Sequence, residues 1–297
     1  FPQDSASADQ LMRHADHAMY QAKQAGKNRY HYFDLKDDNE VKSHSESLRE
    51  IGAALEHGEF VLHYQPKVNM KTGALTGVEA LIRWQHARRG LLAPQFFLPT
   101  IKEHPLTVKL GEWVIETAVA QVARWNATGL KTSVSVNIDA MHLQQENFVD
   151  RLLEILSRYP DVQPKQLDLE VLETSAMDDI DKVCTIMRAC CEVGVGFSLD
   201  DFGTGYSSLT YLKRLPADLM KIDQSFVIGM VQDSDDFVIV EGVVGLAKAF
   251  GRNVLAEGVE STAHGELLIA MGCELGQGFG IARPMPAKEL SAWTLDW

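Results

Sequence analysis

The sequence predicts an α/β fold, a (β/α)8 barrel of the TIM type modified by an antiparallel first strand. From about residue 60 onward, short strand-like runs alternate with helical runs, which is typical of a mainly parallel sheet. Eight strand candidates are present, the number that closes such a barrel. The first two are joined at Gly73 by a turn too short for a parallel crossover. An open doubly wound sheet is the alternative, but the chain lacks a glycine-rich dinucleotide fingerprint.

The strand candidates are short apolar or alternating runs bounded by turn residues. They are 60–65, 75–84, 132–138, 166–172, 194–200, 218–222, 253–256 and 274–279. The helices predicted between them show apolar residues at a period near 3.6. They are 112–127, 147–159, 180–192, 206–214, 237–250 and 262–271.

The segment 1–34 does not have the pattern of a domain start. Small apolar residues lie at helical spacing up to Gly26, and a short strand is expected at 30–33. One helix and one strand cannot bury a core of their own. The polar segment 35–47 is expected to be a linker or the beginning of a helix, and the barrel is expected over 48–297.

The composition is that of a soluble globular protein, with 45% hydrophobic and 23% charged residues. A formal net charge of −13 argues against binding of extended nucleic acid, which needs a basic face. No apolar run reaches membrane-spanning length. The four cysteines lack zinc or redox spacing, which favours the cytoplasm as the compartment. Because residue 1 is Phe and no leader follows it, the chain is expected to begin inside a longer protein.

Polar residues follow the predicted strands in a regular way. Catalytic side chains of such barrels lie at the carboxyl ends of the strands. Seven of the eight predicted strands carry an acid, amide or lysine there: Glu79, Asn137, Glu170 with Glu173, Asp200 with Asp201, Lys221 with Asp223, Glu257 with Glu260, and Gln277. Each has a structural explanation taken singly, since Asn137 or Asp201 could begin a turn and Glu173 could precede a helix. No such explanation covers all seven strands together.

The adjacent carboxylates of Asp200 and Asp201 are the centre of this pattern. Like charges repel each other and resist desolvation, so a buried pair needs a compensating cation. A single lysine, Lys221, cannot compensate five or more carboxylates. Sets of Asp, Glu and Asn oxygens suit the hard cations Mg²⁺ or Mn²⁺. The ten histidines do not gather at strand ends, which argues against zinc.

These motifs resemble those of the EAL-domain cyclic-di-GMP phosphodiesterases, over residues 45–297. The matching segments are Glu79-Ala80-Leu81, Ser135-Val136-Asn137, Glu170 with Glu173, Asp200-Asp201-Phe202-Gly203-Thr204-Gly205, Lys221-Ile222-Asp223, Glu257-Gly258-Val259-Glu260 and Gln277-Gly278-Phe279. The resemblance implies hydrolysis of one phosphodiester bond of cyclic-di-GMP to give linear pGpG. Residues 15–29 resemble the C-terminal tail of a GGDEF (diguanylate cyclase) domain, so 1–34 is expected to be a remnant of one.

The resemblance also implies a role for each site residue. Two divalent cations, Mg²⁺ or Mn²⁺, are expected. Glu79, Asn137, Glu170 and Asp200 correspond to ligands of one cation, and Asp200, Asp201 and Glu257 to ligands of the other.

The remaining matched residues correspond to catalytic and substrate-binding groups. Lys221 matches the lysine that touches the attacking water, and Asp223 matches a group that positions this water or a metal. Glu173 and Glu260 match supports of the catalytic set, which also includes Glu79. Substrate contacts are expected from Gln65, Leu81, Arg83 and Gln277. The resemblance further implies a homodimer, with the loop 202–209 joining the metal site to the dimer interface.

Two other functions are kept as alternatives. A degenerate relative would bind cyclic-di-GMP without cleaving it, and loss of metal ligands or of the lysine would favour that function. A dimerising regulatory module would bind no nucleotide at all. Every matched metal ligand and the lysine are present here, which favours the enzyme.

Overall fold

The computed structural model describes residues 35–173, 179–204 and 209–297, together with Met12 and Met19. The chain divides into two units, 1–56 and 57–297. In the first unit, the helix α2 (Leu35–Glu56) contains the whole segment 35–47, so that segment begins a helix. The predicted GGDEF-like helix and the strand 30–33 lie outside the described residues.

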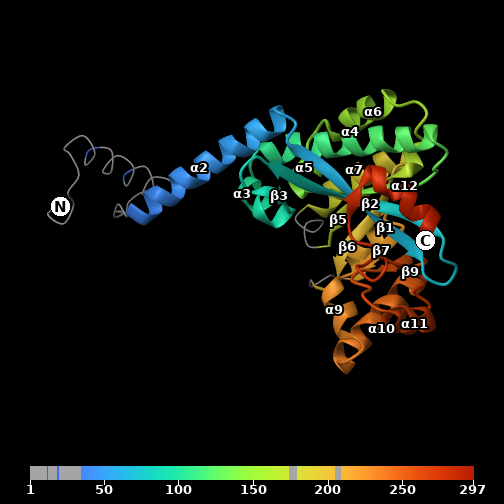
Figure 1. The fold of residues 1–297 in the computed structure, drawn as a ribbon. Helices are drawn as coiled ribbons and strands as arrows, with labels where there is room; N and C mark the ends of the chain where they lie inside the picture. The colour runs from blue at the N-terminus through green and yellow to red at the C-terminus, as the bar shows by residue number, and fades with distance from the viewer. Residues whose placement is uncertain (1–11, 13–18, 20–34, 174–178, 205–208) are drawn as a thin grey trace. The chain divides into compact units, whose positions relative to one another are not determined.

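The second unit contains a closed barrel of eight strands (Figure 1). They are β1 (Phe60–Asn69), β2 (Leu75–His86), β4 (Val134–Ile138), β5 (Leu167–Leu172), β6 (Gly196–Phe202), β7 (Leu219–Ile222), β8 (Asn253–Ala256) and β9 (Leu275–Gly276). Strand β1 is antiparallel to both of its barrel neighbours, β2 and β9, while the other neighbouring pairs are parallel. The predicted fold class is therefore confirmed.

Helices surround these strands (Figure 1). They are α3 (Leu98–Ile101), α4 (Leu106–Ala127), α5 (Ala140–Leu143), α6 (Phe148–Ser157), α7 (Ile180–Val193), α8 (Leu209–Arg214), α9 (Gln224–Gly229), α10 (Ser234–Ala249), α11 (Thr262–Met271) and α12 (Ala287–Asp296), with 3₁₀ turns η1 (Pro94–Phe96) and η2 (Pro164–Gln166). All six predicted helices are present, although 206–208 lie outside the described residues. No described helix has both the length and the apolar character needed to cross a membrane.

Several elements were not predicted. The strands β3 (Gly90–Leu92) and β10 (Met285–Pro286) pair with β2 and β1 beyond the barrel. Helix α4 begins at Leu106 rather than at 112, and β9 is shorter than the predicted range 274–279. Segments of two or three residues are too short to show a hydrophobic period, so pattern alone does not reveal them.

Alternation along the barrel strands separates an apolar outer face from a polar lumen. Val134, Val136, Leu169 and Val171 are buried on β4 and β5. The residues between them, such as Ser135, are polar and pair in register with polar residues of the next strand. Because side chains alternate between the two faces of a strand, the apolar series meets the helices and the polar series enters the barrel. This polar lumen supports the site described below.

A buried histidine packs outside the barrel. His142 lies in α5, is 3% exposed, and its ring meets Phe148 edge-on with 5.1 Å between centroids. A Cβ at Gly111 would lie 2.2 Å from its Nδ1 atom, so this contact requires glycine there. Burial lowers the pKa of His142 to about 4, although Glu112 and Asp139 oppose the shift. The histidine is therefore neutral in the folded protein near pH 7.

This neutral histidine predicts acid-sensitive stability. Its unfolded pKa is about 6.5, so protons bind the unfolded chain preferentially as the pH falls below that value. From pH 7 to pH 5 we expect the free energy of unfolding, measured in urea, to fall by about 2 kcal/mol through this group. The variant His142→Leu should lose that part of the pH dependence, whereas His57→Leu, at an exposed histidine, should keep it. Equal pH slopes in the two variants would contradict the assignment.

Candidate active site

A cavity of about 270 Å³ opens at the carboxyl ends of the parallel strands. All four residues expected to contact substrate line it: Gln65, Leu81, Arg83 and Gln277. The acids Glu79, Asp200, Glu257 and Glu260 line it as well. The structure therefore brings together residues that are up to 212 positions apart in the chain.

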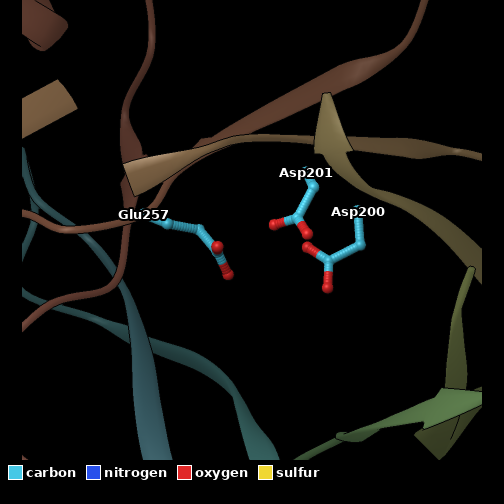
Figure 2. A group of neighbouring side chains, drawn as sticks. All are labelled: Asp200, Asp201 and Glu257. Atoms are coloured by element: carbon cyan, nitrogen blue, oxygen red, sulfur yellow. The ribbon is translucent and has the colours of Figure 1, made fainter. Parts of the chain in front are cut away.

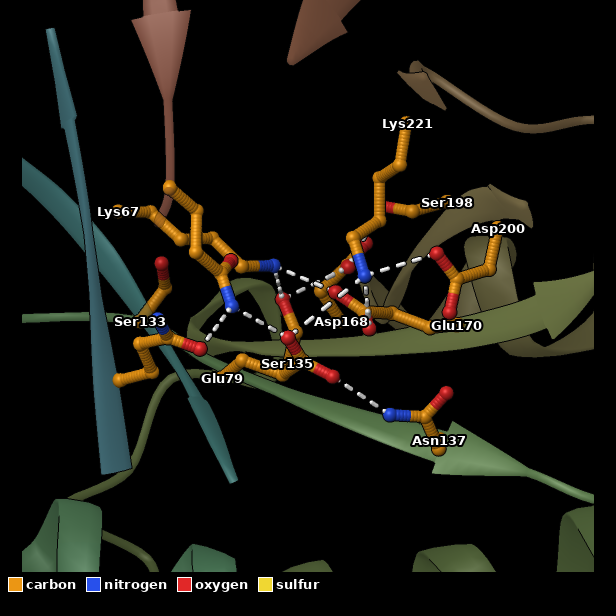
Figure 3. A network of polar contacts seen from close by, with 12 residues as sticks. Lys67, Glu79, Ser133, Ser135, Asn137, Asp168, Glu170, Ser198, Asp200 and Lys221 are labelled. Atoms are coloured by element: carbon orange, nitrogen blue, oxygen red, sulfur yellow. Dashed lines mark hydrogen bonds and ion pairs between the residues drawn. The ribbon is translucent and has the colours of Figure 1, made fainter. Parts of the chain in front are cut away.

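The side chain of Lys221 is the centre of this site (Figure 3). Its Nζ atom lies 2.7 Å from Glu170 Oε2, 2.7 Å from Glu257 Oε1, 2.9 Å from Asp200 Oδ1 and 3.7 Å from Glu79 Oε2. Lys221 and Glu170 are both completely buried. The four carboxylates come from β2, β5, β6 and the end of β8, so the ammonium group joins strands around the barrel.

These contacts set the protonation of the site. Burial alone would lower the pKa of Lys221, but Glu170, Glu257, Glu79 and Asp200 together raise it well above its ordinary value. Burial opposes ionisation of Glu170, yet Lys221 and Lys67 outweigh it and lower the pKa to about 2. Burial raises the pKa of Glu257 to about 8 despite Lys221. Lys221 is thus an ammonium group that can donate hydrogen bonds but cannot accept a proton.

Asp200, Asp201 and Glu257 form an acidic cluster, whose carboxylates face one another in Figure 2. One oxygen from each lies within 4.8 Å of the others. Simple alternation along β6 would send neighbouring side chains to opposite faces. Asp201 instead has φ of 52°, in the left-handed region, and the pairing of β6 with β7 is irregular between Leu199 and Phe202. This irregularity allows both aspartates to face the site.

The same cluster disfavours ionisation of Asp201. Burial, then repulsion by Asp200 and Asp223, raises the pKa of Asp201 to about 6. Asp200 Oδ1 is buried, and its partner is the ammonium group of Lys221 at 2.9 Å, an ion pair without hydrogen-bond geometry. Because Lys221 shares its single charge among four carboxylates, the negative charge of Asp200 is only partly compensated.

Two side-chain amides donate hydrogen bonds to the carboxylate of Glu79. Asn137 Nδ2 donates to Glu79 Oε1 at 2.7 Å, and Gln277 Nε2 donates to Glu79 Oε2 at 2.6 Å. Gln277 Nε2 also lies 3.0 Å from Gln65 Oε1. Gly278 lets this segment approach the chain after β8, because a Cβ there would lie 2.2 Å from the backbone nitrogen of Val259.

Three of the expected catalytic residues lie outside the contacts of Lys221. Glu173 Oε2 accepts from the backbone N–H of Gly203 at 3.0 Å, which fixes the chain just after β6. Asp223 caps α9 by accepting from the backbone N–H of Ser225. Glu260 is exposed at the rim of the cavity. The structure places these residues around the carboxylate cluster rather than within it.

Sequence reasoning missed a lysine that contacts the carboxylates of the site. Lys67 of β1 is 4% exposed, and its Nζ atom donates to Glu170 Oε1 at 2.5 Å and to Ser135 Oγ at 2.6 Å. The available signal was its spacing of two residues from Gln65, which places both side chains on one face of the strand.

The donor set fits hard divalent cations. Carboxylate oxygens converge from Glu79, Glu170, Asp200, Asp201 and Glu257, with the Asn137 amide beside Glu79. Two buried lysines leave this set with an excess of negative charge. Oxygen donors with excess negative charge are the environment that Mg²⁺ and Mn²⁺ prefer.

Another hollow, of about 440 Å³, lies between α6 and α7. It is lined by side chains such as Val149, Lys182 and Ile186, and it contains none of the residues that contact Lys221. The smaller cavity is the better candidate for the active site, because charged groups converge there and not in the larger hollow.

Comparison with known families agrees with this geometry. Residues 48–284 match the EAL domain. The chain belongs to the EAL domain family. The resemblance noted from the sequence is thereby confirmed for the EAL part, and the match begins within α2 and ends before α12.

Relatives of this EAL domain are found among curated bacterial signalling proteins. The bifunctional diguanylate cyclase/cyclic di-GMP phosphodiesterase MucR of Pseudomonas aeruginosa is 42% identical over 293 residues, covering 98% of this chain and 43% of MucR. The cyclic di-GMP phosphodiesterase PdeR of Escherichia coli is 35% identical over 292 residues, covering 98% of this chain and 44% of PdeR. The chain thus spans less than half the length of these two relatives.

The fold of the EAL domain is also found in solved structures. The PaMucR phosphodiesterase in its c-di-GMP complex aligns with a TM-score of 0.79 and 43% identity, covering 82% of this chain and 99% of that one. The EAL enzyme Bd1971, in a form bound to cAMP and cyclic-di-GMP, aligns with a TM-score of 0.82 and 27% identity, covering 98% of this chain and 77% of that one.

Removal of the central ammonium group predicts a large loss of stability. In the variant Lys221→Met, several buried carboxylates lose their compensating charge, which costs about 3 kcal/mol or more when one partner of a buried pair is removed. The free energy of unfolding in urea, with chelator present, should fall by that amount. Lys71→Met is the matched control, because Lys71 is exposed and its pair with Glu274 is open to water, so its removal should change the free energy of unfolding little. Similar losses in both variants would show that Lys221 does not hold the site together.

Proposed function

We propose that this EAL domain is a metal-dependent phosphodiesterase that hydrolyses cyclic-di-GMP to linear pGpG. The observation that carries the proposal is the convergence of Glu79, Glu170, Asp200 and Glu257 on Lys221 at the mouth of the barrel. The names of MucR and PdeR as cyclic-di-GMP phosphodiesterases, and the c-di-GMP complex of PaMucR, support this choice of substrate.

The acidic residues would hold two divalent cations, Mg²⁺ or Mn²⁺. Glu79, Asn137, Glu170 and Asp200 would bind one, and Asp200, Asp201 and Glu257 would bind the other. Bound cations of this kind activate water and stabilise negative charge on the attacking and leaving oxygens of a phosphodiester. The position of Asp200 supports this assignment, because it meets Lys221 together with Glu79 and Glu170 and also lies in the cluster with Asp201 and Glu257.

Lys221 would orient the nucleophile. As an ammonium group it would donate a hydrogen bond to the attacking water in place of one of the three carboxylates that its N–H groups meet here, and it would stabilise negative charge that develops on the phosphate. It cannot remove the proton of that water, because its pKa is raised and it has no free electron pair. Asp223, which neighbours Asp201, would hold the water in position, and Glu173 and Glu260 would support the surrounding backbone and rim.

Other side chains that line the cavity would bind the substrate. Arg83 can grip a phosphate through two parallel hydrogen bonds, and burial lowers its pKa without removing its charge. The amides of Gln65 and Gln277 would accept and donate hydrogen bonds, and Leu81 would contact an apolar surface such as a base. Arg83 and the cations together would offset the repulsion between the acidic site and an anionic diester.

The preceding segment belongs to the same proposal. Residues 1–34 would be the end of a GGDEF-like domain, joined through 35–47 to the barrel at 48–297. The alignment with MucR, which is named as a bifunctional cyclase and phosphodiesterase, covers 98% of this chain and supports this organisation. A homodimer is the assembly that the family resemblance implies, and sedimentation of the purified chain would test it.

The first test of the enzyme is direct. The purified chain incubated with cyclic-di-GMP and Mg²⁺ or Mn²⁺ should release pGpG, resolved by chromatography, and chelator should stop the release. Intact nucleotide that co-elutes with the protein would instead identify a receptor. Intact nucleotide that does not bind would favour the regulatory module.

A substitution of Glu79 tests the assignment of the metal ligands. Glu79→Ala removes a ligand and leaves Asn137 and Gln277 without their acceptor, so kcat should fall by about a hundredfold or more. Glu274→Ala, at a half-exposed glutamate paired with Lys71, should keep the wild-type kcat. The readout is the rate of pGpG formation, with circular dichroism as the check on folding. Turnover at the wild-type rate in Glu79→Ala would refute the metal assignment.

A further inference from the structure

A second lysine contacts the carboxylate cluster from inside the barrel. Lys67 Nζ donates to Glu170 Oε1 at 2.5 Å, while Lys221 Nζ donates to Glu170 Oε2 at 2.7 Å (Figure 3). Each oxygen of the Glu170 carboxylate therefore has its own ammonium partner. Since Glu170 is completely buried, no water can replace either partner without a rearrangement of the lumen.

The regular alternation of β1 points Lys67 inward. Lys67 lies two residues after Gln65, so both side chains lie on the same face of the strand. The pairing with β2 is irregular beside it: Lys67 pairs with Gly77 and Val68 with Leu75, so the extra residue is Thr76 of β2. The Lys67 carbonyl accepts from the Thr76 hydroxyl at 3.0 Å, which fixes this part of β1 to β2.

The ammonium group of Lys67 also contacts a layer of hydrogen-bonded polar side chains. Ser135 Oγ accepts from Lys67 at 2.6 Å and donates to Asp168 Oδ2 at 3.0 Å. Ser198 Oγ donates to the same Asp168 oxygen at 2.6 Å. Lys67 is thus held between Glu170 and a hydrogen-bonded layer formed by β4, β5 and β6.

We propose that Lys67 is a positioning residue, which holds Glu170 Oε1 so that only Oε2 is presented to the cation site. The inference rests on the proposed function and extends it to a residue with no assigned role. A ligand held through one oxygen keeps one orientation as the site exchanges cations. Outer partners of metal ligands typically contribute tenfold to a hundredfold in metal affinity.

A competing role for Lys67 predicts the opposite change in metal affinity when the lysine is removed. If Lys67 acted on the site only as a nearby positive charge, it would repel a bound cation, and its removal would tighten binding. If it positions Glu170, its removal leaves Oε1 without a donor and frees the carboxylate to turn, so binding weakens. The direction of the change in metal affinity therefore separates the two roles.

The test is calorimetric titration of the metal-free chain with Mn²⁺. In Lys67→Met, the dissociation constant of the tighter site should rise by about tenfold or more. Lys71→Met, the same change at an exposed lysine just after β1, should leave it unchanged. A purely structural role would lower the fraction of chains that bind and leave the affinity of the rest unaltered. An unchanged or lower dissociation constant in Lys67→Met would overturn the proposal.

A second pair of variants tests the proposal even if Lys67→Met does not fold. Ser135→Ala removes one anchor of the ammonium group and should weaken Mn²⁺ binding about threefold, as expected for one hydrogen bond. Ser198→Ala removes a hydroxyl from the same Asp168 oxygen without touching Lys67 and should not weaken it. Equal affinities in these two variants would also overturn the proposal.

Failure of the inference can be told from failure of the proposed function. If wild-type chain binds Mn²⁺ and cleaves cyclic-di-GMP while Lys67→Met binds Mn²⁺ equally well, only the role of Lys67 is wrong. If wild-type chain binds no Mn²⁺, both are wrong. When pGpG release is followed as well, Lys67→Met should need more Mn²⁺ for half-maximal rate and should regain most of its kcat at saturating Mn²⁺.

Discussion

The site depends on charge compensation inside a closed barrel. A single ammonium group, that of Lys221, meets four carboxylates from four strands, and a second one, that of Lys67, meets Glu170 from the other side. Burying any of these charges alone would cost several kcal/mol. Burial, with repulsion from neighbouring carboxylates, raises the pKa values of Glu79 and Glu257 even though Lys221 opposes both shifts. Because the carboxylates outnumber the two lysines, the site has the character that divalent cations prefer.

A local departure from regular strand geometry directs the side chains of the acidic cluster. The pairing of β6 with β7 is irregular near Asp201, where charged side chains enter the site. Asp201 holds a left-handed backbone conformation that non-glycine residues rarely adopt. Such conformations persist only where the surrounding structure stabilises them, and they gather at functional sites. Here they bring neighbouring carboxylates to one side of a strand whose regular geometry would separate them.

Much of this arrangement could be predicted from the sequence, for a physical reason. Parallel strands place their carboxyl ends at one rim, so Asn137, Asp200, Lys221 and Glu257 could be grouped from the order of strands alone. That reasoning failed for Lys67, because β1 runs antiparallel and its later residues lie deeper in the barrel rather than at the mouth. It could not foresee the backbone of Asp201, which depends on irregular pairing with β7. Nor could it detect β10, whose two residues pair with a strand more than two hundred positions away.

The closure of the barrel by β1 has a consequence for biosynthesis. Strand β1 forms a hairpin with β2 early, but its other barrel neighbour is β9, and Val68 pairs with Gly276. The contacts of Gln277 with Glu79 and of Gln65 with the carbonyl of Ala282 depend on the same late segment. A chain emerging from the ribosome therefore cannot complete the lumen until the segment 275–282 has been made. Until that segment pairs with β1, the lumen stays open to water, which weakens the repulsion between the acidic strand ends.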